Sequence, residues 1–155
     1  MTKLKEGDKA PLFKAKDQSG KLVSLSDFKG RKVVLYFYPK DDTPGCTKEA
    51  CNFRDNYSML KKKGFEVLGV SVDNEKSHQK FINKYDLPFT LLADDDKKIV
   101  NDYGVWGEKS FMGRKYMGTL RTTFIISEQG KIEKIITKVD TENSSQQVLD
   151  ALAGK

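Results

Sequence analysis

Apolar residues recur along the chain in short runs separated by turns, and this pattern predicts alternating strands and helices. The runs at 32–38 and 65–72 are almost continuously apolar, which is typical of strands buried on both faces of a sheet. Shorter apolar runs beside turn residues predict further strands. The predicted strands are 22–25, 32–38, 65–72, 90–92, 122–127 and 132–137.

Other segments have apolar residues spaced three or four positions apart, as on one face of a helix. The clearest of them is 43–63, which Gly64 ends. Its apolar face is formed by Cys46, Ala50, Phe53, Tyr57 and Leu60. The remaining predicted helices are 77–85, 97–103 and 144–152.

The order of these elements is strand, helix, strand, helix, strand, helix, a strand hairpin and a last helix. Strands that alternate with helices favour a largely parallel sheet covered on both faces, and the hairpin adds antiparallel strands. We therefore predict an α/β protein with a thioredoxin-like fold: a mixed central sheet, helices on both faces, and a single domain spanning residues 1–155. Chemistry in such sheets collects beyond the carboxyl ends of the strands, which points to the segment after Tyr38.

That segment contains the only two cysteines of the chain, Cys46 and Cys51. Thr43 is a favoured N-cap residue and Pro44 a favoured first residue, so Cys46 becomes the third residue of the predicted helix. The free N–H groups and partial positive charge of a helix N-terminus favour the thiolate, the reactive form of cysteine. The alternative is that Cys46 is a small buried apolar residue. The Thr-Pro-Gly sequence before it and the second cysteine favour a reactive thiol.

The spacing of the two cysteines limits what they can do together. Residues five apart in an ideal helix are ~7.5 Å apart along the axis and about 140° apart around it, so their Cα atoms are roughly 8.6 Å apart. A disulfide tolerates at most ~7 Å. Cys46 and Cys51 therefore form a disulfide only if the first turns of the helix unwind, which disfavours a static structural bridge. A zinc site is also disfavoured, because two cysteines and the lone His78 cannot supply four ligands.

A strongly stabilised thiolate also needs a full positive charge nearby. Arg121 is the best candidate because it directly precedes the predicted strand at 122–127, and its guanidinium stays charged and offers several donors. Arg31, Arg54 and Arg114 compete with it. We expect His78 to be an exposed helix residue without a catalytic role.

Composition excludes some classes of protein. The 155 residues include 28 basic and 22 acidic side chains, and the net charge of +6 raises the question of nucleic-acid binding. The basic residues are spread along the chain, so we predict a solvated basic surface and no nucleic-acid partner. The apolar runs are too short to cross a membrane, and the N-terminus lacks the apolar core of a signal peptide. We therefore expect a cytoplasmic protein, where a cysteine pair is more often catalytic than structural.

The sequence around the cysteines resembles that of the peroxiredoxins. Pro39, Thr43 and Cys46 match the signature Pro-x-x-x-Thr/Ser-x-x-Cys of that family. The fuller run at 43–51, Thr-Pro-Gly-Cys-Thr-x-x-Ala-Cys, is similar to the bacterioferritin comigratory protein subfamily, also called Q-type peroxiredoxins. The segment at 104–113 is similar to the same subfamily, and the resemblance covers nearly the whole chain.

The resemblance implies a thioredoxin-dependent peroxidase. Cys46 would be the peroxidatic cysteine, which reacts with hydrogen peroxide or an organic hydroperoxide and becomes a sulfenic acid. Cys51 would be the resolving cysteine, which forms an intramolecular disulfide with it, and thioredoxin or a similar dithiol protein would reduce that disulfide. No metal or organic cofactor is implied. The subfamily resemblance favours a monomer, with a dimer as the alternative.

The resemblance also implies roles for residues around the thiol. Thr43 and Arg121 match positions that hold the thiolate and peroxide oxygens, Pro39 matches the residue that shields the site, and Glu49 would orient Arg121. The chemistry agrees, because donors must face the charge that develops on both peroxide oxygens. We expect the Thr43 hydroxyl, the Cys46 backbone N–H and Arg121 to be those donors.

Other functions use the same residues. A peroxide-sensing regulator would oxidise similarly but pass the signal to a partner protein, with little turnover. A general dithiol–disulfide oxidoreductase is less well supported, because the chain has no Cys-x-x-Cys pair.

Overall fold

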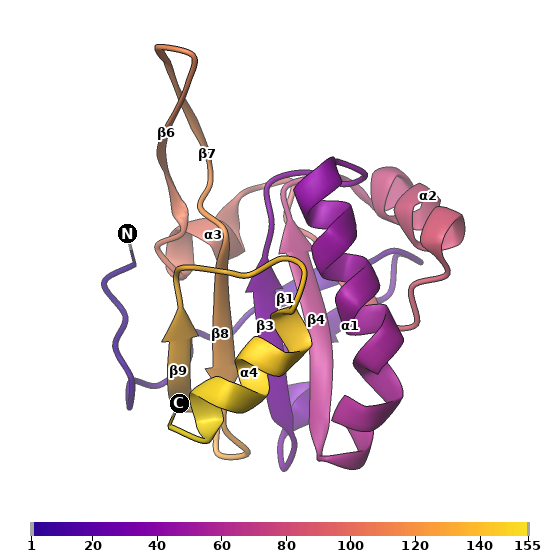
Figure 1. Cartoon of the computed structure of the whole chain (residues 1–155), viewed down its shortest axis with the longest axis vertical. Helices are drawn as coiled ribbons and strands as arrows, with labels where there is room; N and C mark the ends of the chain where they lie inside the picture. The colour runs from indigo at the N-terminus through magenta and orange to yellow at the C-terminus, as the bar shows by residue number, and fades with distance from the viewer. Residues whose placement is uncertain (1, 155) are drawn as a thin grey trace.

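The computed structural model describes residues 2–154 and has a seven-stranded mixed sheet at its centre (Figure 1). The strands of this sheet are β1 (Lys14–Asp17), β2 (Leu22–Ser24), β3 (Lys32–Phe37), β4 (Phe65–Ser71), β5 (Thr90–Ala93), β8 (Thr122–Ile126) and β9 (Ile132–Ile136). Their spatial order is β2-β1-β5-β4-β3-β8-β9. A separate hairpin of β6 (Trp106–Phe111) and β7 (Arg114–Thr119) projects away from the body of the protein.

The predicted α/β class with a mixed sheet is confirmed, but the sheet is less parallel than expected. Only β3, β4 and β5 are parallel neighbours, and every other adjacent pair in the sheet is antiparallel. The three parallel strands include the two nearly continuous apolar runs, as strands covered on both faces require.

Helices cover both faces of the sheet. They are α1 (Pro44–Lys62), α2 (Glu75–Tyr85), α3 (Lys98–Asp102) and α4 (Ser144–Leu152), with a short 3₁₀ helix, η1 (Leu25–Phe28). Even-numbered residues of β3, such as Tyr36, belong to the same cluster as side chains of α1, α2 and α4. Odd-numbered residues, such as Phe37, belong to the opposite cluster with α3 and η1. Within residues 2–154, no helix combines the length and the apolar character needed to cross a membrane.

The α1 helix has nearly the predicted limits. Thr43 has an extended backbone at the N-cap, Pro44 occupies the first turn, and Gly64 follows the helix with a φ of 88° that favours glycine. The side chain of Thr43, however, makes no capping hydrogen bond. The start of α1 therefore depends on Pro44 and on the attachment of the preceding loop.

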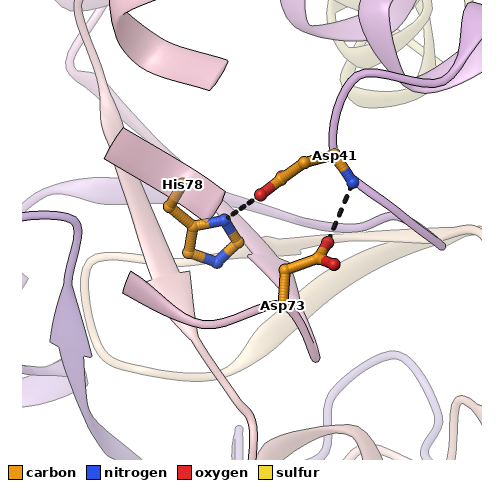
Figure 2. Close-up of side chains that lie close together, drawn as sticks. All are labelled: Asp41, Asp73 and His78. Atoms are coloured by element: carbon orange, nitrogen blue, oxygen red, sulfur yellow. Dashed lines mark hydrogen bonds and ion pairs between the residues drawn. The ribbon is translucent and has the colours of Figure 1, made fainter. Parts of the chain in front are cut away.

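The prediction that His78 is exposed is wrong: its side chain is wholly buried. The α2 helix begins at Glu75, where the Asn74 side chain accepts a hydrogen bond from Ser77 N. His78 precedes the buried Phe81 by three residues, so it lies on the face of α2 that turns toward the sheet. Its ring is hydrogen-bonded to Asp41, from the loop before α1 (Figure 2).

Two strand segments were not predicted from the sequence. β1 reads Lys-Ala-Lys-Asp and has little apolar character, and it is held by backbone pairing with β2 and β5. The β6–β7 hairpin is largely exposed, so neither of its faces needs apolar side chains. A method that looks for regularly spaced apolar residues therefore does not find these strands.

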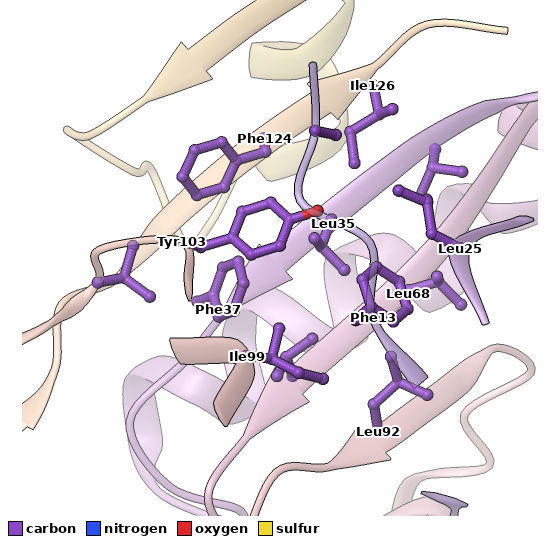
Figure 3. Packing of buried hydrophobic residues seen from close by; sticks show 14 of the residues in the cluster. Phe13, Leu25, Leu35, Phe37, Leu68, Leu92, Ile99, Tyr103, Phe124 and Ile126 are labelled. Atoms are coloured by element: carbon purple, nitrogen blue, oxygen red, sulfur yellow. The ribbon is translucent and has the colours of Figure 1, made fainter. Parts of the chain in front are cut away.

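The larger core cluster lies on the α3 side of the sheet (Figure 3). Aromatic rings fill it, and Tyr103 packs against both Phe37 and Phe124 with ring centroids 5.4 and 5.1 Å apart. The Tyr103 hydroxyl donates to Pro11 O at 2.7 Å, which satisfies its polar atom. This packing fixes the ends of β3 and β8 from which the candidate active site is built.

Candidate active site

Cys46 lies just beyond the carboxyl end of β3, in the first turn of α1. It is the third residue of the helix and is 1% exposed, and both cysteines are free thiols. The carbonyl of Thr43 accepts the first helical hydrogen bond, from Thr47 N at 2.8 Å. The N–H groups of the first turn have no carbonyl partner within the helix, as at every helix N-terminus. The thiol is therefore placed where a negative charge is stabilised.

Arg121 reaches Cys46 because of the strand register. Phe37 pairs with Thr122 across β3 and β8, so Arg121, one residue earlier, lies at the carboxyl end of β3. Its Nη2 donates to Cys46 Sγ at 3.3 Å, and its Nη1 donates to Glu49 Oε1 at 2.7 Å. One guanidinium thus binds the thiol and a carboxylate at the same time.

The competing arginines lie elsewhere. Arg31 forms an ion pair with Glu66, and Arg54 forms one with Asp55. Arg114 is exposed at the start of β7. Among the four candidates, the fold brings Arg121 to Cys46.

Glu49 follows Cys46 by almost one turn of α1 and is wholly buried. Burial raises the pKa of this carboxyl to about 7, although Arg121 opposes the shift. Its second oxygen, Oε2, has no hydrogen-bond partner within residues 2–154. Glu49 therefore holds Arg121 with one oxygen and titrates close to neutral pH.

Gly45 keeps the approach of Arg121 open. A Cβ atom at this position would lie 3.2 Å from Arg121 Nη2, which is closer than ordinary van der Waals contact. The absence of a side chain before Cys46 thus allows the guanidinium to lie close to the backbone of the helix N-terminus.

Thr43 and Pro39 belong to the loop between β3 and α1, and both are half-buried. The Thr43 hydroxyl donates to Lys40 O at 2.8 Å. In this arrangement its single proton is directed to Lys40 O, and the role of Thr43 as a donor to the peroxide stays a prediction. The oxygen lone pairs of this hydroxyl remain able to accept a hydrogen bond.

Cys51 is half-buried on the same unbroken helix as Cys46. A regular helix keeps their Cα atoms roughly 8.6 Å apart, beyond the range of a disulfide. The next residue, Asn52, is attached to the start of α4: its Nδ2 donates to Glu142 O at 2.9 Å and its Oδ1 accepts from Ser145 N at 2.8 Å. These two hydrogen bonds attach α1 to the start of α4 one residue beyond Cys51.

Sequence reasoning missed a polar cluster behind the loop. Asp41, Asp73 and His78 place their possible metal-ligating atoms within 4.8 Å of one another. Hydrogen bonds already join these groups: His78 Nδ1 contacts Asp41 Oδ2, and Asp41 N donates to Asp73 Oδ2 (Figure 2). The only sequence signal was a histidine on the inward face of α2.

A free thiol at a helix N-terminus, in contact with an arginine and next to a thioredoxin-like sheet, is the arrangement of a thiol-based oxidoreductase. Residues 6–135 match the AhpC/TSA family, and the chain belongs to that family. Its relatives are peroxiredoxins, which are thiol peroxidases. The resemblance seen in the sequence is therefore confirmed.

Individual relatives agree in sequence and in structure. The "Putative peroxiredoxin bcp" of Coxiella burnetii is 52% identical over 146 residues, which cover 94% of this chain and 97% of that protein. The "Peroxiredoxin Bcp" of Escherichia coli strain K12 is 49% identical over 152 residues, covering 98% and 97%. The crystal structure of a cysteine-to-serine mutant of PrxQ from Xylella fastidiosa has a TM-score of 0.92 at 29% identity, covering 99% of this chain and 98% of that chain.

Proposed function

We propose that this chain reduces hydrogen peroxide and organic hydroperoxides at Cys46, with Cys51 as the resolving thiol and a thioredoxin-like dithiol protein as the reductant. The observation that carries the proposal is the contact between Arg121 Nη2 and Cys46 Sγ, 3.3 Å long, at the N-terminus of α1. A cation and a helix N-terminus together favour the thiolate that this chemistry needs.

In the first step the Cys46 thiolate attacks one peroxide oxygen. A sulfur–oxygen bond forms, the O–O bond breaks, and Cys46 becomes a sulfenic acid. The other oxygen leaves as hydroxide or alkoxide and takes up a proton to give water or an alcohol. Arg121 and the Cys46 backbone N–H face the developing negative charge. Thr43 Oγ1 accepts a hydrogen bond from the hydroxyl group of the peroxide while it donates its own hydrogen bond to Lys40 O, and Pro39 shields the thiol from water.

In the second step the Cys51 thiol attacks the sulfenic acid of Cys46. A disulfide forms and water leaves. Because a regular helix holds the two residues too far apart, the first turns of α1 must unwind. A dithiol protein then reduces the disulfide and restores both thiols.

The proposed cycle also indicates the kind of reductant and the cellular compartment. Thiol–disulfide exchange with a second protein requires that the disulfide become accessible, and unwinding of α1 exposes it. A cycle that ends in two thiols suits a reducing compartment, so we assign the chain to the cytoplasm. The resemblance to the Q-type subfamily favours a monomer, so we propose that the active unit is a monomer and that the chain is a single domain.

Stopped-flow oxidation of the reduced protein tests the proposal. Peroxide should oxidise the wild-type protein to the Cys46–Cys51 disulfide, and thioredoxin should support turnover. Cys46→Ser should abolish both reactions. Cys51→Ser should react once and then accumulate sulfinic acid at Cys46, detected by mass spectrometry. A Cys46→Ser variant with full activity would overturn the assignment, and oxidation without turnover by any dithiol protein would favour a peroxide sensor.

Hydrogen exchange tests the unwinding step separately. The backbone amides of residues 47–51 should exchange faster in the disulfide form than in the dithiol form, because their helical hydrogen bonds are lost. Equal protection of these amides in both forms would contradict the proposed rearrangement.

A further inference from the structure

The loop that leads into α1 is held from behind by a buried cluster of hydrogen bonds. Asp41 Oδ2 lies 2.7 Å from His78 Nδ1 and also accepts from Ser77 Oγ at 2.7 Å (Figure 2). Its Oδ1 accepts from the Tyr38 hydroxyl, and its backbone N–H donates to Asp73 Oδ2 at 2.8 Å. Both carboxylate oxygens of Asp41 are thus hydrogen-bonded: Oδ2 to side chains of α2, and Oδ1 to Tyr38, the residue that follows β3.

The hydrogen-bond pattern of the His78 ring identifies where its protons lie. Nε2 is 2.9 Å from Leu92 O, and because a carbonyl only accepts, Nε2 carries a proton. Nδ1 lies 2.7 Å from Asp41 Oδ2 and forms the second hydrogen bond of the ring. The side chains are 0% and 4% exposed, so this hydrogen bond is shielded from water.

The contact between Asp41 and His78 links the loop before α1 to α2 and β5. Asp41 precedes Thr43 by two residues and Cys46 by five, whereas His78 lies on α2 and its other nitrogen is fixed to β5. The neighbouring Asp42, with a strained φ of 56°, is tied to the end of α2 by Lys84 and Tyr85. Those side chains are more exposed, whereas the hydrogen bonds that Asp41 forms with His78 and Tyr38 are buried.

We propose that His78 is a positioning residue for the peroxidase reaction. By holding Asp41 it keeps the loop at 38–43 and the first turn of α1 in the arrangement in which Cys46 meets Arg121. The same contact opposes the unwinding of α1. It therefore shifts the equilibrium toward the form with a complete helix, which reacts with peroxide, and away from the unwound form, which forms the disulfide. This inference rests on the proposed function.

Two isosteric variants separate the Asp41 contact from the Leu92 contact. In His78→Asn the amide nitrogen can replace Nδ1 and keep the contact with Asp41, while the contact with Leu92 is lost. In His78→Gln the amide nitrogen can replace Nε2 and keep the contact with Leu92, while the contact of residue 78 with Asp41 is lost and Asp41 keeps only its other hydrogen bonds. Each variant loses one buried hydrogen bond, so the midpoints of thermal unfolding should fall by similar amounts.

Stopped-flow measurements on the full-length variants give the rates of Cys46 oxidation and of disulfide formation, and mass spectrometry gives the fraction of sulfinic acid. In His78→Gln we expect oxidation of Cys46 by peroxide to slow on the order of tenfold, the effect of losing one buried hydrogen bond. Disulfide closure should become faster, and the fraction of sulfinic acid at high peroxide should fall. His78→Asn should stay close to the wild-type protein in all three quantities. Hydrogen exchange of residues 39–47 should rise only in His78→Gln.

The outcomes distinguish this inference from the proposed function. A wild-type protein that does not react with peroxide would overturn the proposed function, whatever the variants do. A reactive wild-type protein with equal kinetics in both variants would overturn the role of His78 alone. Loss of activity in both variants together with a common loss of stability would indicate a structural histidine and would also overturn it.

Discussion

At the scale of single residues, the guanidinium of Arg121 is the charged group that the fold brings into contact with Cys46. It contacts the thiol with one nitrogen and Glu49 with another. Sequence reasoning selected Arg121 because it precedes a predicted strand, and the register of β3 and β8 explains why that position reaches the thiol. His78 was misjudged, because a polar residue inside a helix gives no sign of which neighbour will pair with it.

Replacing Arg121 by lysine tests the need for a forked donor. A lysine ammonium keeps the charge but cannot address Cys46 and Glu49 together in one plane. We expect Arg121→Lys to lower the second-order rate constant for Cys46 oxidation on the order of 100-fold, as when a preorganised donor is lost. Stopped-flow kinetics measure it, with the exposed Arg114→Lys as the control. Equal rate constants for the two variants would contradict this role for Arg121.

Glu49 should make stability depend on pH. Its pKa is raised from 4.5 to about 7 in the folded protein, so the folded state binds the proton more tightly than the unfolded state. The resulting stabilisation is complete below pH 4.5 and is lost as the pH rises to about 7. Relative to Glu49→Gln, the wild-type protein should lose roughly 3 kcal/mol across this interval, measured by urea unfolding. Parallel pH profiles for the two proteins would show that Glu49 does not titrate in this range.

At the scale of elements, the proposed cycle divides α1 into a segment that unwinds and a segment that stays helical. Cys46 and Cys51 would belong to the first segment, and Asn52, which is hydrogen-bonded to the start of α4, would begin the second. The sequence predicted α1 and the buried strands because their apolar positions repeat regularly. It could not predict β1 or the β6–β7 hairpin, whose backbones pair with little burial, nor the attachment of Asn52, which depends on an element 90 residues away.

Removing the Asn52 side chain should let unwinding spread along α1. Asn52→Ala loses two hydrogen bonds to the start of α4 and should be less stable by about 1–2 kcal/mol, measured by urea unfolding. In the disulfide form its amides beyond residue 52 should exchange faster than those of the wild-type protein. The exposed Ser58→Ala on the same helix is the control. Unchanged exchange beyond residue 52 would mean that other contacts set the limit of unwinding.

At the scale of the whole molecule, the sheet separates two cores and carries the active site at one end. The core on the α3 side contains no proposed site residue, whereas the core on the other side includes Cys46 itself. The β6–β7 hairpin leads directly into Leu120 and Arg121 but pairs with no other strand. Its tip is exposed, with Phe111 at 67% and Met112 at 88%.

The hairpin tip should contribute little to folding. Replacing both Phe111 and Met112 by serine should change the free energy of unfolding by less than about 0.5 kcal/mol, as for other exposed positions. The buried Phe37→Ala should cost about 3–5 kcal/mol under the same conditions. Urea unfolding followed by circular dichroism measures both. A large loss in the serine variant would show that the tip packs against the body.

The placement of two cysteines five residues apart on one helix has a consequence for protein engineering. Substitutions that raise helix propensity within residues 44–51 would increase thermostability. Each would also raise the free energy needed to unwind the first turns of α1, a step that the proposed cycle requires in every turnover. Such a variant would survive heating better while its thiol accumulated irreversible oxidation during sustained exposure to peroxide. Stabilisation of this chain is better sought beyond Asn52, in the segment that the reaction leaves folded.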